Sequence, residues 1–145
     1  MIRFLGILLA VVFATLSLFH IFWAAGWRLG GGAAVPVVNG ARLFNPSTFS
    51  TIIVAVLLLL AMLVVLGRIG IWGAHLPVWI FRLGATGISL LFLLRAIGDF
   101  RYVGFFKIVS ETDFARWDTW LYSPLCLFIA GIAFLINFYR IPNPV

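Results

Sequence analysis

Five polar side chains of the sequence lie in or beside long apolar segments: His20, Arg95, Asp99, Asp118 and Tyr122. An imidazole can act as a general acid or base, and a guanidinium can hold an anionic or carbonyl oxygen. Ionisable groups are costly in apolar surroundings, so they suggest a functional site and a charge partner. For Arg95 that partner is either Asp118 or Asp99, which lies one helical turn further along. We take these residues as the candidate polar cluster.

The same residues also fit a structural role. Arg95 is within a turn of the end of its apolar segment, where its long side chain can reach the membrane surface. Asp99 and Asp118 fit solvated helix ends, and a single histidine in a helical bundle is often a hydrogen-bonded core residue. An ion-paired structural cluster is therefore the alternative to a functional site.

The composition identifies the solvent of the chain. Of its 145 residues, 64% are hydrophobic and only 10% are charged. Soluble domains are about half apolar, and a domain of this size leaves much of its surface exposed. We therefore predict one integral membrane domain over residues 1–145, with the lipid bilayer as its main surroundings.

Four segments are long and apolar enough to cross the hydrocarbon core, which takes about 20 residues of helix. They cover residues 4–24, 49–67, 78–98 and 119–139. Lone strands cannot span, because their backbone groups would lack hydrogen-bond partners in lipid. The predicted fold is an all-α membrane protein, a four-transmembrane-helix bundle. The first and third spans end, and the fourth begins, at the same membrane surface, which brings the five candidate residues to one level.

Small residues recur at helical spacing in three of these spans, as expected where membrane helices pack. They are Gly6, Ala10, Ala14 and Ser17 in the first span; Gly84, Gly87 and Gly98 in the third; and Thr119, Ser123, Cys126, Ala130, Ala133 and Asn137 in the fourth. His20 continues the first stripe, while Leu91 and Arg95 lie on the third, so both polar residues should face the bundle. In the alternative interpretation, one stripe makes contacts in a homo-oligomer.

Two loops carry local structural signals. In the first loop, Asn39-Gly40 between short apolar runs predicts a small extramembrane hairpin, because both turn residues accept positive φ. In the third loop, Ser110 and Asp113 resemble a capping box, so we expect a helix to start near Glu111. Pro124 interrupts the hydrogen bonding of the fourth span. We therefore expect an interfacial helix joined to that span by a kink.

The charges of the chain argue against several classes of function. The net charge is +6, but the basic residues are spread singly instead of clustering on a face, so we predict no nucleic-acid binding. His75 belongs to the opposite membrane surface, about 30 Å from His20, and no other metal-ligand spacing is present. The single cysteine excludes an intrachain disulfide and a CxxC redox pair. No motif identifies a cofactor.

The orientation follows from the arginines. Arg3, Arg68, Arg82 and Arg140 stand at the four helix ends on the N-terminal side, where no acidic residue occurs. A plain count of basic residues favours the other side, which has six of them. Because these four arginines directly flank the spans and the first loop is long, we predict that both termini are cytoplasmic, in a multi-pass protein of the cell membrane.

Three motifs carry a family resemblance. They are HIFWAAGW at residues 20–27, followed by Pro36; RAIGDF at residues 95–100; and FARWDTWLYSPLC at residues 114–126. Over nearly the whole chain, this pattern resembles the bacterial family catalogued as domain of unknown function 3995. The resemblance implies a small bacterial four-helix membrane protein and no particular activity.

Two functions fit these patterns. The first is a non-enzymatic membrane protein that binds a lipid, an apolar small molecule or a partner membrane protein. The alternative is a small intramembrane enzyme acting on a lipid-soluble substrate, with His20 as acid or base and Arg95 holding a substrate oxygen. A transporter is disfavoured, because a chain of this size would need to oligomerise to line a path.

Overall fold

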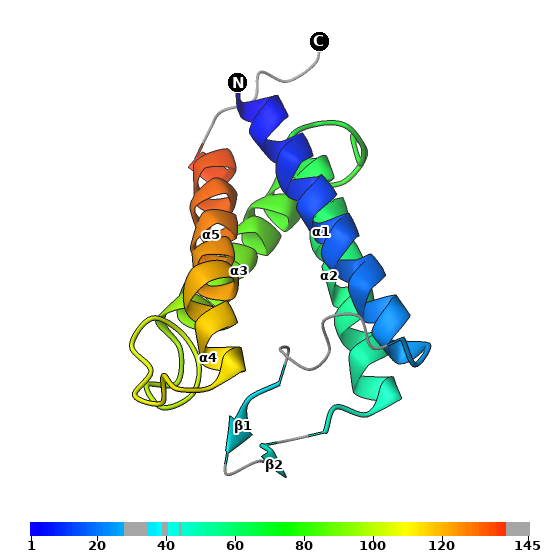
Figure 1. Cartoon of the computed structure of the whole chain (residues 1–145). Coiled ribbons are helices and arrows are strands. Elements are labelled where there is room, and N and C mark those ends of the chain that lie inside the picture. Colours follow the sequence, from blue (N-terminus) through cyan, green and yellow to red (C-terminus); the bar gives the residue numbers. More distant parts are fainter. Residues whose placement is uncertain (28–34, 39–40, 44, 139–145) are drawn as a thin grey trace.

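The computed structural model describes residues 1–27, 35–38, 41–43 and 45–138. It is built mainly of helices, with two very short strands in the first loop (Figure 1). In chain order the elements are α1 (Ile2–Ala24), β1 (Val37–Val38), β2 (Ala41–Arg42), α2 (Thr48–Arg68), α3 (Val78–Ile97), α4 (Asp113–Trp117), the π-helical turn η1 (Asp118–Tyr122) and α5 (Ser123–Phe138).

Four helices in the described part of the chain are long and apolar enough to cross a membrane: Ile2–Ala24, Thr48–Arg68, Val78–Ile97 and Asp113–Phe138. The first three agree with the predicted spans to within two residues, because long apolar runs define helix ends in lipid. The fourth begins six residues earlier than predicted, since 113 rather than 119 is its first residue. The all-α, four-helix architecture is confirmed.

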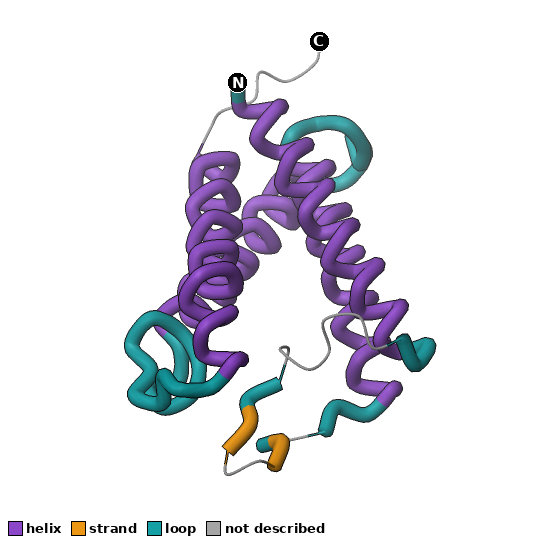
Figure 2. Tube along the Cα trace, in the orientation of Figure 1, coloured by secondary structure: helices purple, strands orange, loops and turns teal. Residues whose placement is uncertain are grey.

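The helices form two packed pairs. α1 lies along α2, and α3 lies along α5; the pairs meet near the N-terminus and diverge toward the first and third loops (Figures 1 and 2). Phe13 of α1 and Phe92 of α3 join the pairs, with ring centroids 5.7 Å apart. Leu9, Phe13, Ile129 and Ile136 are fully buried in the shared core. The N-terminus and the end of α5 lie at the same end of the molecule (Figure 1).

Small residues allow close packing within each pair, as predicted for the first and fourth spans. The Ser17 hydroxyl donates to the Ala55 carbonyl across α1 and α2 at 2.9 Å. The Ser89 hydroxyl donates in the same way to Ala130 of α5 at 3.0 Å. A side-chain carbon at Gly6 would come within 2.5 Å of Ile69, so the close approach there needs glycine.

The packing face predicted for the third span is correct at only some positions. A side-chain carbon at Gly84 would come within 2.7 Å of Val64 of α2, and Arg95 is half-buried, as expected for residues that face the bundle. The prediction is wrong for Gly87, which is exposed, and for Leu91, which is 65% exposed. The residues that α3 buries are Phe81, Ala85, Ile88, Ser89 and Ala96, so bulky side chains also fill its contacts with neighbouring helices.

The hairpin predicted in the first loop has its two strands. β1 and β2 pair antiparallel, Val37 opposite Arg42 and Val38 opposite Ala41. The Leu43 N–H also donates to the Pro36 carbonyl at 2.8 Å. The predicted turn residues, Asn39 and Gly40, lie outside the described residues.

The fourth span is one continuous helix, Asp113–Phe138, with a widened turn, where a separate interfacial helix joined to the span was expected. It begins at Asp113, close to the expected start near Glu111. Its N-cap is Thr112, whose hydroxyl accepts the Ala115 N–H at 3.1 Å, so the capping box expected at Ser110 is wrong. Within the widened turn, the Ser123 N–H bonds to the carbonyl five residues back, that of Asp118. This wider turn precedes Pro124, whose ring would collide with a carbonyl in a regular α-helix.

Candidate functional site

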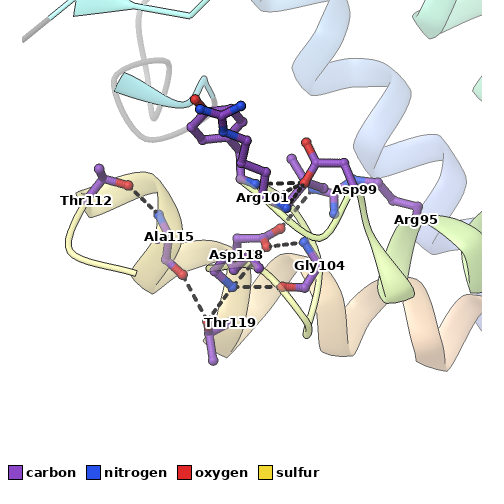
Figure 3. A network of polar contacts seen from close by, with 11 residues as sticks. Arg95, Asp99, Arg101, Gly104, Thr112, Ala115, Asp118 and Thr119 are labelled. Carbon is purple, nitrogen blue, oxygen red and sulfur yellow. Dashed lines mark hydrogen bonds and ion pairs between the residues drawn. The ribbon is translucent and has the colours of Figure 1, made fainter. Parts of the chain in front are cut away.

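The Asp118 carboxylate is the centre of a buried polar network where η1 begins (Figure 3). The residue is 0% exposed. Its Oδ1 accepts Arg95 Nη2 at 2.9 Å, and its Oδ2 accepts the Gly104 N–H at 2.7 Å and Lys107 Nζ at 3.2 Å. A buried carboxylate needs this compensation, because desolvation would otherwise cost several kcal/mol. The ion pair expected between Arg95 and Asp118 is therefore present.

Lys107 is the member of the network that the sequence analysis missed. Its side chain is only 4% exposed. Its ammonium also donates to the Gly104 carbonyl at 3.0 Å and to the Thr119 hydroxyl at 2.6 Å. An ammonium has three donors, and here three acceptors surround it. The available signal was that Lys107 is the only lysine among ten basic residues, the rest of which are arginine.

Two glycines fold the loop between α3 and α4 so that it reaches Asp118. Gly98 and Gly104 both have φ near +91°, which favours glycine. A side-chain carbon at Gly98 would overlap the Val103 carbonyl, and one at Gly104 would overlap the carbonyl of Ile97. This close crossing of the backbone directs the Gly104 N–H at the Asp118 carboxylate.

Asp99 organises the same loop and does not pair with Arg95. Its Oδ1 accepts the backbone N–H groups of Arg101, Tyr102 and Val103 at 2.9, 2.7 and 2.9 Å. Desolvation alone would raise the pKa of the Asp99 carboxyl, but these N–H donors outweigh it and lower the pKa below its ordinary value. Of the two candidate partners for Arg95, the structure therefore selects Asp118.

Arg95 is the least enclosed charged member of the network. Its side chain is 34% exposed, whereas that of Asp118 is fully buried. Its Nη2 bonds to Asp118, but its Nη1 is buried without a hydrogen-bond partner. Two cations thus face one carboxylate, and the network has an excess of positive charge.

His20 makes its contacts within α1. Its Nδ1 lies 2.8 Å from the Leu16 carbonyl oxygen, and its ring meets the Trp23 ring at a centroid distance of 5.0 Å. Because a carbonyl only accepts, Nδ1 carries a proton and donates it to the Leu16 carbonyl. Among the described residues, no hydrogen bond connects His20 to Arg95 or Asp118, since α1 diverges from α3 at this level (Figure 1).

Tyr122 lies half-buried at the end of η1, with its ring centroid 6.1 Å from that of Phe114. It follows Asp118 by four residues along the same helix. The structure thus joins Arg95 directly to Asp118 and gives Asp99 a separate role in the loop. A single site that also includes His20 and Tyr122 stays a prediction.

The described part of the chain has no group of three or more His, Cys, Asp or Glu side chains that could hold a metal ion. His75 lies in the loop between α2 and α3, at the opposite end of the molecule from α4 (Figure 1). Cys126 is buried in α5, where it packs as an apolar residue.

The family described as "Protein of unknown function (DUF3995)" matches residues 13–134. The chain belongs to this family. The match contains all five candidate residues together with Lys107 and Gly104, and it confirms the resemblance seen in the motifs. Neither the curated proteins nor the solved structures gave a match. The DUF3995 domain therefore includes the entire Asp118 network.

Proposed function

We propose that this DUF3995 protein is a multi-pass integral membrane protein that binds a lipid or lipid-like molecule through an anionic headgroup at Arg95. The observation that carries the proposal is the excess of cations over carboxylates around Asp118, combined with the partly exposed Arg95 side chain. An anionic oxygen beside this side chain would balance the excess charge.

Apolar surface next to Arg95 supports an amphiphilic ligand. Leu91 precedes Arg95 by one helical turn and is 65% exposed, and Leu94 is 64% exposed. A ligand with its headgroup at Arg95 can lay an acyl chain along these leucines on the outside of α3. A small soluble anion would gain nothing from this surface, so the arrangement favours a membrane amphiphile.

The second candidate function is an intramembrane enzyme, and one observation favours it. The bond from Nδ1 to the Leu16 carbonyl fixes the His20 ring, so that Nε2 is the nitrogen that a substrate would meet. Against it, the Asp118 carboxylate is already occupied by three donors, so it does not serve as an acid or base. Such an enzyme would depend on His20, with Arg95 holding the substrate.

We also propose a localisation and a membrane topology. The protein lies in the cell membrane, with four crossings and both termini in the cytoplasm. Four helices of sufficient length support the crossings. The arginines at the helix ends near the N-terminus, where the sequence has no acidic residue, support the orientation.

The binding proposal is tested by mass spectrometry of lipids that copurify with the detergent-solubilised protein. We expect an anionic lipid with the wild type, and at least a fivefold loss of it with Arg95→Gln. Arg82→Gln is the matched control, because Arg82 is an exposed arginine at the other end of α3. Equal retention by the wild type and Arg95→Gln would overturn the proposal.

The enzyme alternative makes a different prediction. There, His20→Ala would leave folding and lipid retention intact while abolishing conversion of the bound molecule. The products are found by comparing the copurified lipids of the two proteins after incubation. Unchanged composition in both would exclude the enzymatic role.

A further inference from the structure

The outer face of α4 and η1 carries a hollow of about 300 Å³, lined by Asp113, Arg116, Trp117 and Trp120. These positions are spaced three, four and seven residues apart, so they lie on one side of the helix. The opposite side carries Phe114, Ala115 and Asp118, all buried. The hollow is therefore separate from the Asp118 network.

The two charged residues of the hollow have opposite signs and no ion-pair partner among the described residues. Asp113 and Arg116 are both exposed, and neither forms an ion pair within the described part of the chain. Both Asp118 and Arg95, in contrast, belong to an ion pair. The hollow thus offers one free anionic and one free cationic group to a ligand.

Two indole rings complete the lining. Trp120 is 83% exposed and Trp117 is 51% exposed, although large aromatic residues are usually well buried in soluble domains. Tryptophan concentrates where a bilayer meets water, because one part of its ring is apolar and its N–H is polar. An indole face also attracts ammonium groups.

The length of the fourth helix places the hollow at the depth of lipid headgroups. Asp113–Phe138 has 26 residues. At 1.5 Å per residue this helix is about 39 Å long. The hydrocarbon core is only about 30 Å thick, so about six residues extend beyond it. The charged residues of this helix, Asp113, Arg116 and Asp118, all lie near its first end, which favours that end as the one outside the core. The hollow begins at Asp113, the first residue of that helix.

From these observations we infer that the hollow is a binding site for the headgroup of a zwitterionic phospholipid. Arg116 binds the phosphate through charge-assisted hydrogen bonds. Asp113 and the indole rings bind the ammonium group. Charge complementarity selects this headgroup over an anionic one, because the Asp113 carboxylate repels a ligand that has negative charge and no cation.

The test uses delipidated full-length protein in detergent and native mass spectrometry. Phosphatidylethanolamine and phosphatidylglycerol are titrated separately, and the binding that Arg116→Gln removes is assigned to the hollow. We expect this part of the binding to be at least fivefold tighter for the zwitterionic lipid. Arg116→Gln should weaken phosphatidylethanolamine binding at least fivefold. Asp113→Asn should remove the preference between the two lipids. Unchanged preference in Asp113→Asn would overturn the proposal.

Matched controls separate this site from general surface charge. Arg101 is an exposed arginine of the neighbouring loop, and its guanidinium lies 5.3 Å from the centroid of the Tyr102 ring. Arg101→Gln should leave the preference for phosphatidylethanolamine intact. Trp120→Ala should weaken binding, whereas Trp79→Ala should not, although Trp79 at the start of α3 is also exposed, by 63%. Equal effects of both tryptophan variants would mean that no specific site exists.

Two further measurements show whether the ligand is a lipid and whether the hollow is independent of Arg95. Phosphoethanolamine alone, at millimolar concentration, should not displace the lipid; displacement would show a site for soluble phosphate compounds and overturn the lipid assignment. The preference should also persist in Arg95→Gln, because Arg95 belongs to α3 and its partner Asp118 lies on the face of α4 and η1 opposite to the hollow. Its loss there would show that the hollow is not an independent site.

Discussion

The Arg95 guanidinium at the end of α3 and the Asp118 carboxylate at the start of η1 form an ion pair of 2.9 Å across 23 positions of the sequence. The pair connects α3 to the helix that continues into α5, its packing partner. Its carboxylate also holds the intervening loop through Gly104 and Lys107. One buried side chain therefore fixes two helices and the loop between them.

The first prediction concerns the stability that this pair provides. Asp118→Ala leaves Lys107 buried without its carboxylate and should lower the free energy of unfolding by about 3 kcal/mol. Arg95→Ala should have a smaller effect, because Lys107 and Gly104 still compensate Asp118. The double variant should be less destabilised than the sum of the two. Thermal unfolding of the wild type, the two single variants and the double variant in detergent measures these losses of stability. Strict additivity would contradict an energetic coupling between Arg95 and Asp118.

Asp113→Ala is the control for the same experiment. Asp113 lies on the same helix but is exposed and outside the ion pairs of the described residues. Its removal should change the midpoint of unfolding little, since exposed charges contribute at most about 1 kcal/mol. If Asp113→Ala lowered the midpoint of unfolding as much as Asp118→Ala does, burial of the Asp118 carboxylate would not be the cause of the destabilisation.

The second prediction concerns the backbone crossing at Gly104. Gly104→Ala places a methyl group against the Ile97 carbonyl at a positive φ, so the loop must move and the Gly104 N–H must leave Asp118. We expect a loss of at least about 2 kcal/mol and faster hydrogen exchange in the loop. Gly87→Ala is the matched control, because open space surrounds that helical glycine and alanine favours helix. Equal midpoints for the two variants would contradict the assigned role.

The sequence predicts the parts of this protein that follow from hydropathy and helix geometry. The spans were predictable because lipid requires long apolar helices. The partner of Arg95 could be narrowed to Asp118 or Asp99 because these residues lie at one membrane level, and the structure selects Asp118. The role of Lys107 was not predictable in this way. It depends on a loop path set by Gly98 and Gly104, and no periodic pattern encodes such a path.

Two features show where local sequence patterns do not determine packing. The spacing of the glycines in α3 suggested one packing face, but the buried residues of this helix include Phe81 and Ile88. The shape of these side chains therefore decides which face of α3 is buried. At Pro124 the sequence suggested a kink after an interfacial helix. A widened turn at Asp118–Tyr122 lets one helix continue through this region. Whether the chain forms such a turn or a kink depends on packing against other helices, which the sequence of one segment does not reveal.

The third prediction concerns topology. Because α1, α2, α3 and the helix from Asp113 to Phe138 form four potential crossings, both chain ends should face the same compartment. Reporter fusions placed before Met1 and after Val145 should give the same signal, and a fusion in the loop around His75 should agree with them. Opposite signals at the two ends would mean an odd number of crossings and would contradict the four-span arrangement.

The last prediction concerns pH and Asp99. Its pKa is lowered in the folded loop by the N–H groups of Arg101, Tyr102 and Val103, relative to about 3.9 in an unfolded chain. A lowered folded-state pKa contributes stability above the unfolded value, and this contribution is lost as the pH falls through the folded value. The loop should therefore keep slow exchange of these three amides near pH 5 and open as the pH falls below about 4.

Asp99→Asn should remove much of this pH dependence, because an amide does not titrate. Glu111→Gln should preserve it, since Glu111 is an exposed acid of the same loop. Hydrogen exchange corrected for the intrinsic effect of pH measures the difference. An equally strong acid opening in Asp99→Asn and the wild type would show that another group controls the loop.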